Sequence, residues 1–363
     1  MRVLQLRLRN FRNYDEMILG AEHPLPNGLI AITGQNGFGK TNLVEALAFL
    51  SLAGSFRGSP SEAMVKRGST SAVVRGEIED GSRQTWIEAE IQASGRNRVL
   101  VNRQKATRRQ TLEALSVSIF APSDLDVIQD GPQGRREVID DAIVALHPPH
   151  ESIRSRLDRV LRQRNALLKS ARGTLDESAS VTLEVWDSQL AELGDRWARL
   201  RIDLIERVYP GLCAAYREIS KSEAEVSMRY QSSWQPAGLG PALKQARVEE
   251  VRRGVTLVGP HRDDIDFGLN GLPARNHASQ GEQRSLAIAL RLAIHRSITD
   301  EMGTPPVLVL DDVLSELDPY RREALVRGIP GGQIFLTSAG DMPTEVKPQL
   351  HVVLNERGMV SVL

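Results

Sequence analysis

A glycine-rich stretch followed by lysine and threonine is the part of this sequence best suited to chemistry. Gly34 precedes the triplet Gly39-Lys40-Thr41, an apolar run occupies residues 29–33, and apolar residues at helical spacing follow. The order is therefore strand, glycine loop and helix, which is the context of a phosphate-binding P-loop. Backbone N–H groups of such a loop can surround a triphosphate because no Cβ blocks the approach. The pattern predicts a nucleoside triphosphate site over residues 34–41.

The side chains of this stretch suit different parts of a bound nucleotide. We expect Lys40 to bridge the β- and γ-phosphates and the Thr41 hydroxyl to hold Mg²⁺. The helix N-terminus adds partial positive charge beside the phosphates. The other residues expected to line the phosphates are Gly34, Gln35, Asn36, Gly37, Phe38 and Gly39. The alternative is an ordinary glycine turn before a helix.

A second candidate site element is the acidic end of a late apolar run. Residues 307–310 read Val-Leu-Val-Leu and are followed by Asp311 and Asp312. In a chain with a P-loop, this pattern indicates a Walker B strand, in which Asp311 reaches Mg²⁺ directly or through water. Asp312 is then placed to orient or activate the attacking water as a catalytic residue, beside Lys40. The alternative is a solvated strand end.

Residues 279–283, Ser-Gln-Gly-Glu-Gln, resemble the signature motif of ATP-binding-cassette ATPases. This motif is a helix N-terminus with a hydroxyl and a glycine, and therefore another anion site. In that class it completes the nucleotide site of a partner subunit, so Ser279 and Gly281 are candidate nucleotide contacts in trans. Ser279 and Glu282 also have the spacing of a capping box, and the two interpretations are compatible.

The hydrophobic pattern indicates an α/β protein with a helical insertion. Alternation predicts strands early and late in the chain, with Asn270-Gly271 as a strong hairpin turn. The expected strands cover residues 3–9, 29–33, 72–79, 84–92, 98–101, 117–120, 255–258, 265–269, 307–312, 334–337 and 351–354. Between residues 133 and 253 the pattern is helical. We expect a discontinuous nucleotide-binding lobe of residues 1–132 and 250–363, and a helical lobe of residues 133–249.

Composition is that of an ordinary globular protein, and local charge is more informative than total charge. The 363 residues carry zero formal net charge, and Cys213 is the only cysteine, which excludes a disulfide framework or a cysteine-based zinc site. We expect no signal peptide, no membrane partner and a cytoplasmic protein. Residues 96–109 and 154–172 are rich in arginine and lysine and could neutralise phosphates, or simply be solvated faces.

Taken together, several segments resemble the RecF family of bacterial recombination-repair ATPases. The matching segments are Asn10-Phe11-Arg12-Asn13-Tyr14, residues 34–47, Ser55-Phe56-Arg57, residues 159–169, Gly259-Pro260-His261-Arg262-Asp263-Asp264, residues 278–284 and residues 310–318. The resemblance implies an ABC-type, SMC-like head with an antiparallel β section and an inserted helical lobe. It also implies ATP and Mg²⁺ as cofactors, and two copies that dimerise when ATP is bound.

The same resemblance implies binding of single-stranded or gapped DNA and slow, DNA-stimulated ATP hydrolysis. RecR, RecO and RecA would be partners, in gap repair, replication and the SOS response. Two departures from cassette transporters are present: Asp312 stands where transporters usually have glutamate, and Thr337, not histidine, follows the strand at residues 334–336. Both departures are also features of the RecF family, and they suggest weak catalysis. Residues 120–124 are the expected Q-loop region.

Three other functions remain to be compared. A transport ATPase would dock on a membrane protein, but the arginine-rich insertion and the absent histidine disfavour it. A structural SMC subunit needs a longer heptad run than this chain has. A small-molecule kinase shares the P-loop and has no need of residues 279–283.

Overall fold

The computed structural model describes residues 1–339, 347–356 and 360–362, which fall into two compact units. Unit 1 comprises residues 1–126, 214–222 and 284–363, and unit 2 comprises residues 127–213 and 223–283. The two lobes expected from the sequence stay a prediction. Residues 250–283, which we expected in the nucleotide-binding lobe, group with the helical residues of unit 2 in the contact-based division. Among the described residues, no helix is both long and apolar enough to cross a bilayer.

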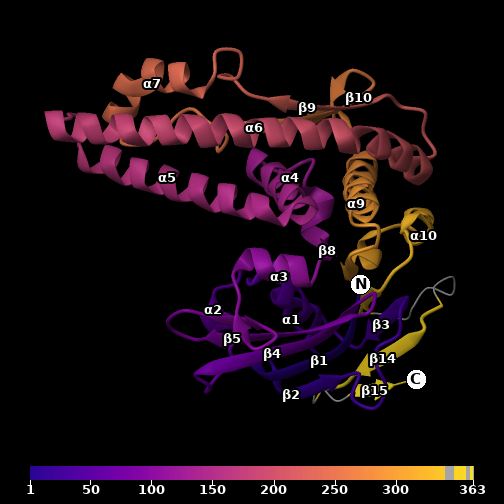
Figure 1. The fold of residues 1–363 in the computed structure, drawn as a ribbon. Coiled ribbons are helices and arrows are strands. Elements are labelled where there is room, and N and C mark those ends of the chain that lie inside the picture. Colours follow the sequence, from indigo (N-terminus) through magenta and orange to yellow (C-terminus); the bar gives the residue numbers. More distant parts are fainter. Residues whose placement is uncertain (340–346, 357–359, 363) are drawn as a thin grey trace. The chain divides into compact units, whose positions relative to one another are not determined.

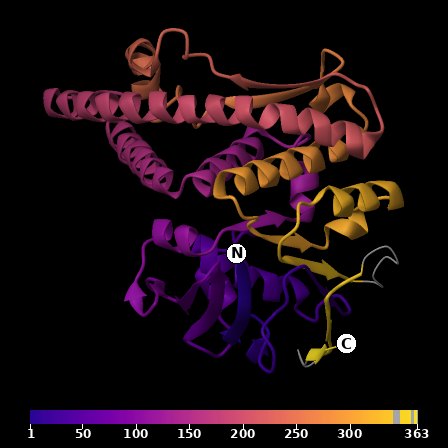
Figure 2. The same ribbon diagram turned by 45° about the vertical axis from the view of Figure 1, so that its right-hand side comes forward.

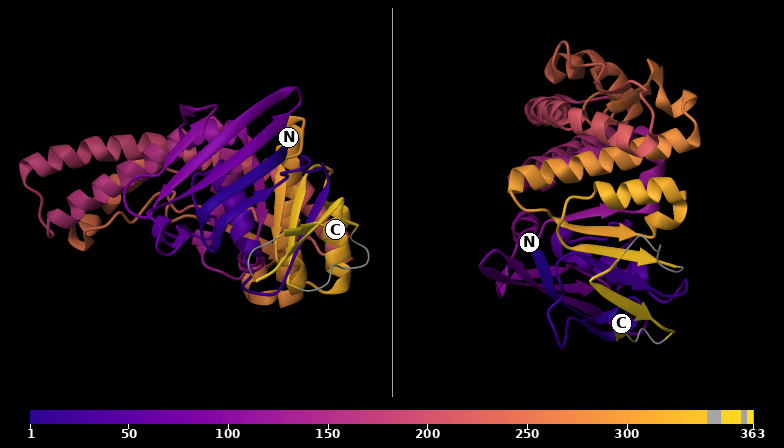
Figure 3. Two further views of the ribbon diagram at one scale, coloured as in Figure 1. Left: turned by 90° about the horizontal axis from the view of Figure 1, so that it is seen from below. Right: turned by 90° about the vertical axis from the view of Figure 1, so that its right-hand side faces the viewer.

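The centre of unit 1 is a largely parallel sheet (Figures 2 and 3). Its strand order is β15 (Val360–Val362), β14 (Leu350–Leu354), β3 (Leu29–Thr33), β13 (Ile334–Ser338), β12 (Val307–Asp311) and β8 (Val117–Phe120). Every residue of β12 is buried, as its continuous apolar sequence predicts for a central parallel strand. The β3 and β12 strands flank β13, so the P-loop and the acidic strand end at the same edge.

A second, antiparallel sheet of unit 1 is formed by the expected hairpins (Figure 1). Its order is β2 (Tyr14–Leu19), β1 (Arg2–Phe11), β4 (Ser71–Asp80), β5 (Arg83–Gln92), β6 (Arg98–Val101) and β7 (Gln104–Lys105). Alternate residues such as Leu6, Val74 and Ile87 are buried in one core cluster. The helix α1 (Lys40–Leu52) contacts strands of both sheets and is buried almost throughout, which fixes the position of the P-loop at its start.

The remaining helices of unit 1 are short or shared with unit 2. The short helices are α2 (Ser61–Met64), α3 (Arg108–Ala114) and α10 (Pro319–Gly328). The helix α9 (Gln280–Met302) belongs to unit 1 from Arg284 onward, and α6 (Glu177–Ser220) belongs to it from Ala214 onward.

Unit 2 is mainly helical, as the pattern predicts. Its helices are α4 (Pro132–Leu146), α5 (Glu151–Ser170), the long α6, α7 (Leu239–Arg253) and α8 (Ala274–His277). Figures 1 and 3 show α5 running beside α6. The expected apolar stripe of α6 is buried at Leu190, Leu193, Trp197 and Leu204.

Two expectations for unit 2 were wrong. The helical pattern is interrupted by β9 (Val226–Gln231), which pairs with β10 (Asp264–Leu269), and β10 pairs in turn with β11 (Leu272–Pro273). Residues 255–258 form no strand. Their backbone is committed to side chains instead, because Thr256 N–H donates to Asn165 Oδ1 at 2.8 Å and Leu257 N–H donates to Glu250 Oε1 at 2.7 Å.

Candidate functional site

The glycine loop between β3 and α1 has the backbone that only glycine adopts easily. Gly34, Gly37 and Gly39 have φ values of 152°, 91° and 98°. A Cβ on Gly34 would lie 2.7 Å from Leu354 O, and one on Gly39 would lie 2.6 Å from the Asn13 side chain. These glycines therefore allow both the turn and the close approach of neighbouring chain segments.

Lys40 begins α1 and folds back over the loop. Its Nζ donates hydrogen bonds to Gly34 O at 2.7 Å and Gln35 O at 3.0 Å. Burial lowers the pKa of Lys40, and the negative charges of Asp312 and Asp311 oppose that shift. The structure thus brings the predicted lysine and both predicted acids within electrostatic reach of one another.

Thr41 and Asp311 also meet, as expected for a shared cation site. Thr41 Oγ1 donates to Asp311 Oδ1 at 2.9 Å. Burial raises the pKa of Asp311, while hydrogen bonds from Thr337 and Thr41 lower it. A carboxylate beside a hydroxyl suits a hard cation such as Mg²⁺, which prefers oxygen ligands.

Asp312 has an unusual backbone and an unsatisfied side chain. Its φ and ψ are 53° and 18°, the left-handed region, and its N–H donates to Thr337 Oγ1 at 2.9 Å. Its Oδ1 is buried and accepts no hydrogen bond from the described residues. A buried carboxylate oxygen without a partner is rare and suits contact with a water or a cation. This geometry fits the expected nucleotide, metal and water.

Residues that the sequence alone did not assign to the site support the loop from behind. Tyr14 Oη donates to Gly39 O at 2.9 Å, and Asn13 Nδ2 donates to Phe38 O at 3.4 Å. Asn42 on α1 in turn donates to Asn13 Oδ1 at 2.8 Å. The β1–β2 turn therefore fixes the loop backbone. A signal was present only in the resemblance of residues 10–14 to the RecF family.

Arg57 is exposed, and its positive charge acts to lower the pKa of Asp311. Its N–H donates to Ser55 Oγ, which donates to Glu45 Oε1 at 2.5 Å. Glu45 is buried and forms a two-bond ion pair with Arg12 at 2.8 Å. This chain of contacts connects the Arg57 segment to α1, and the Arg57 side chain is exposed to solvent.

The segment with the signature motif belongs to unit 2 and forms the predicted capping box. Ser279 N–H and Oγ both donate to Glu282 Oε2 at 2.8 Å, and Glu282 N–H donates to Ser279 Oγ at 3.3 Å. Ser279 remains exposed, and Gly281 lies in the first turn of α9. The exposed helix start is thus ordered by its own side chains.

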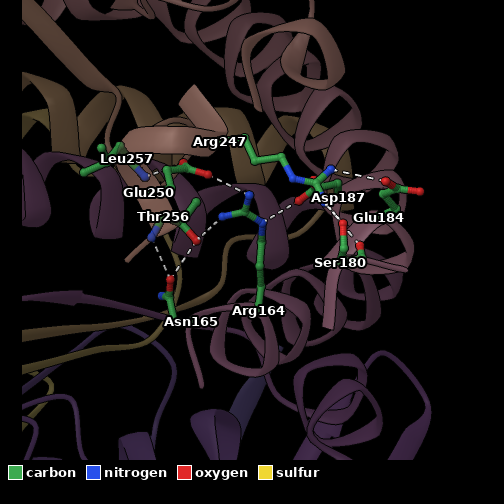
Figure 4. A network of polar contacts seen from close by, with 9 residues as sticks. All are labelled: Arg164, Asn165, Ser180, Glu184, Asp187, Arg247, Glu250, Thr256 and Leu257. Atoms are coloured by element: carbon green, nitrogen blue, oxygen red, sulfur yellow. Dashed lines mark hydrogen bonds and ion pairs between the residues drawn. The ribbon is translucent and has the colours of Figure 1, made fainter. Parts of the chain in front are cut away.

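Unit 2 contains buried charges that organise its elements. Arg164 on α5 is fully buried and donates to Asp187, Thr256 and Glu250 at 2.7, 2.8 and 2.6 Å. Figure 4 shows these partners arriving from α6, α7 and the segment after α7, with Asn165 hydrogen-bonded to Thr256.

The segment Gly259-Pro260-His261-Arg262-Asp263-Asp264 has a similar organising role. Pro260 O accepts from buried Arg201 at 2.7 Å, and Asp263 accepts from Trp234 at 2.8 Å and from Tyr230. Asp264 accepts two hydrogen bonds from Arg135. These acids are therefore structural within unit 2.

Comparison with known proteins agrees with the arrangement of unit 1. The model of the RecF/RecN/SMC N terminal domain family matches residues 2–358. The chain is 37% identical to "DNA replication and repair protein RecF" of Renibacterium salmoninarum, covering 94% of this chain and 95% of the relative. It is 39% identical to the protein of the same name from Streptomyces avermitilis, covering 94% of each.

Solved structures extend the comparison to three dimensions. The chain resembles a structure described as the recombination mediator protein RecF with ATP, in the RecFOR pathway, with a TM-score of 0.89, 29% identity and coverage of 99% and 97%. An Smc head bound to a domain of ScpA shares the fold alone, with a TM-score of 0.56 and 16% identity, covering 99% of this chain and 97% of that one. The chain has the SMC-like ABC-type ATPase fold, and it belongs to the RecF family.

Proposed function

We propose that this chain is an ATP-dependent DNA-binding ATPase of recombinational repair and replication. Two copies close around ATP, bind single-stranded or gapped DNA in the cytoplasm, and hydrolyse ATP slowly when DNA is bound. With RecR and RecO they help to load RecA, which supports the SOS response. The observation that supports the proposal most strongly is the convergence of Lys40, Thr41, Asp311 and Asp312 in unit 1 of a RecF-family chain.

The proposed nucleotide contacts follow from the loop geometry. The loop residues Gly34, Gln35, Asn36, Gly37, Phe38 and Gly39 surround the phosphates, and Lys40 neutralises the β- and γ-phosphates. Thr41 and Asp311 hold Mg²⁺, which supplies charge stabilisation for the transferred phosphoryl group when bound. Asp312 accepts a hydrogen bond from the attacking water and orients it.

Ser279 and Gly281 are proposed to act across a dimer. They occupy an exposed helix start, whose N–H groups and hydroxyl suit the phosphates of ATP held by another copy. ATP would then lie between two chains and stabilise their association. In this arrangement the carboxylate of Asp312 determines how long the dimer lasts, and hydrolysis acts as a timer.

The exposed face of α5 is the proposed DNA contact. Arg156, Arg159, Arg162 and Lys169 are exposed, and none of their side chains forms a hydrogen bond or ion pair in the part of the chain that the structure describes. In the other cationic stretch, residues 96–109, acidic side chains already neutralise part of the positive charge, because Arg109 pairs with Glu113 and Arg98 lies opposite Glu90. A helical face with unpaired cations suits the phosphate backbone of DNA.

Sedimentation of the full chain with and without ATP and gapped DNA tests the proposal. We expect the wild type to dimerise with ATP, and Lys40→Met to remain monomeric because the γ-phosphate is not held. Ser279→Arg should bind ATP normally as a monomer and fail to dimerise. Asp312→Asn should dimerise and hydrolyse ATP at least tenfold more slowly, so that its DNA complex lasts longer.

For each of these roles, one outcome would contradict the proposal. Equal loss of ATP binding and dimerisation in Ser279→Arg would exclude the role in trans. Unchanged turnover in Asp312→Asn would exclude this residue as the water-orienting group. A wild type that stays monomeric with both ATP and DNA would overturn the proposed switch.

A further inference from the structure

Thr337 occupies the end of β13 beside the acidic strand. In the parallel register of β12 and β13, Thr337 pairs with Asp311, so both side chains leave the sheet at the same edge. Thr337 is fully buried. Cassette transporters usually have a histidine at this position. Here the side chain is a threonine, and its hydroxyl contacts the two acids.

The single hydroxyl of Thr337 contacts both acids. Oγ1 donates to Asp311 Oδ1 at 2.8 Å and accepts from the Asp312 N–H at 2.9 Å. A hydroxyl has one proton and two lone pairs, so both hydrogen bonds can form together. The β-branched side chain has a restricted χ1, which keeps the oxygen in place.

These contacts determine how each acid is presented. Asp311 Oδ1 accepts from both Thr337 and Thr41, whereas Oδ2 accepts no hydrogen bond from the described residues. One carboxylate oxygen is thus occupied by hydroxyl groups and the other is available to a cation. Asp312 has a left-handed backbone, and its N–H is held by the same threonine oxygen.

We propose that Thr337 is a positioning residue that fixes the metal-binding oxygen of Asp311 and the left-handed backbone of Asp312 through one hydroxyl. The inference rests on the proposed function, because it assigns Asp311 to Mg²⁺ and Asp312 to the attacking water. Thr337 therefore acts through these two acids. Without the hydroxyl, the Asp311 carboxylate can rotate about Thr41, and the Asp312 N–H has no partner to retain its conformation.

Substitution of Thr337 by valine and by serine separates the hydroxyl from the packing. Valine has nearly the same shape and lacks the hydroxyl, and serine keeps the hydroxyl and loses a methyl group. Thr111→Val is the matched control, because Thr111 is also fully buried in unit 1 and its hydroxyl donates to a backbone carbonyl, Ser51 O, at 2.9 Å. It contacts none of the proposed site residues.

The experiment measures ATP binding to the full chain in EDTA, the Mg²⁺ concentration that gives half of the maximal increase in ATP affinity, and single-turnover hydrolysis. For Thr337→Val we expect unchanged ATP binding in EDTA, an approximately tenfold higher Mg²⁺ requirement and an approximately tenfold lower hydrolysis rate. Thr337→Ser should restore both values to within about threefold of the wild type, and Thr111→Val should match the wild type in both.

Contrary outcomes would overturn the inference. They are wild-type Mg²⁺ dependence and rate in Thr337→Val, the same losses in Thr111→Val, or a serine variant no better than valine. If Thr337→Val bound ATP more weakly in EDTA and also had a lower melting temperature, the role of Thr337 would be purely structural. If the wild type binds Mg-ATP without hydrolysing it, the proposed function fails, while the Mg²⁺ requirement still tests Thr337.

Discussion

Tyr14 shows how a side chain outside the glycine loop can determine the backbone that receives a nucleotide. It is buried, and its phenol contacts Gly39 O, the carbonyl directly before Lys40. Burial also raises the pKa of Tyr14, so the phenol keeps the proton that this hydrogen bond requires. The sequence predicts the loop from glycine spacing and the acids from the apolar run before them. No periodicity assigns Tyr14 to the loop or Thr337 to the acids, because both come from other strands.

At this scale we predict that Tyr14→Phe weakens ATP binding by about three- to tenfold. The substitution removes one of the two hydrogen bonds that Gly39 O accepts, since the Leu43 N–H donates to it as well at 3.0 Å. Loss of one such bond costs about 0.5–1.5 kcal/mol and loosens the loop. Tyr209→Phe is the control, since its hydroxyl also donates to a carbonyl, Val226 O at 2.8 Å, in unit 2. Equilibrium titration with ATP measures the effect. Equal weakening in both variants would argue against a specific role for Tyr14.

At the scale of elements, α5 separates its arginines into two groups. The sequence predicts the helix and its basic composition, but it cannot distinguish the buried Arg164 from the exposed Arg159. Burial of Arg164 depends on Asp187 and Glu250, which arrive from other helices. Arg154 is likewise engaged, by Asp141. Only the exposed members of the cluster are therefore available to a phosphate backbone.

We predict that the double reversal of Arg159 and Arg162 to glutamate reduces affinity for single-stranded DNA by at least tenfold. Loss of two phosphate contacts should also lower the slope of log affinity against log salt by about 1.4. Fluorescence anisotropy at several salt concentrations measures both quantities. Reversal of Arg103 and Lys105 at the β6–β7 turn is the control. A larger loss in the control would transfer the DNA contact to that hairpin.

At the scale of the whole molecule, strand and helix periodicity predicted most of both units. The buried apolar run of β12 and the alternation of β1, β4 and β5 carry enough information on their own. The pairing of β9 with β10 was missed because β9 is short and lies between helices far along the chain. The polar interior was also missed, because each buried charge depends on residues distant in sequence.

One such buried group, His295 on α9, makes stability depend on pH. It is 1% exposed, and neither ring nitrogen has a hydrogen-bond partner among the described residues. Burial, with a smaller effect of Arg296, lowers its pKa from 6.5 to about 4. The unfolded chain therefore binds a proton at higher pH than the folded chain does. Stability is complete above about pH 6.5 and falls as the pH decreases toward 4.

We predict that His295→Leu retains more stability at low pH than the wild type. The shift corresponds to roughly 3 kcal/mol between pH 7 and pH 4, at about 1.4 kcal/mol per pKa unit. His261, whose pKa is also lowered to about 4, still contributes in the variant. Thermal melts from pH 7.5 to pH 4.5 measure the difference. Parallel melting curves for the two proteins across this range would contradict the assignment.

The buried Arg164 network also limits which substitutions unit 2 can tolerate during evolution. Replacing Arg164 alone removes the cation that pairs with the buried Glu250 and the partly buried Asp187, and replacing either acid alone leaves the arginine only partly neutralised. Removing one partner of a buried pair is far more costly than exchanging the set for apolar residues. We therefore expect the positions of Arg164, Asp187 and Glu250 to vary together among descendants of this gene, or to remain fixed together, although they lie on three different helices.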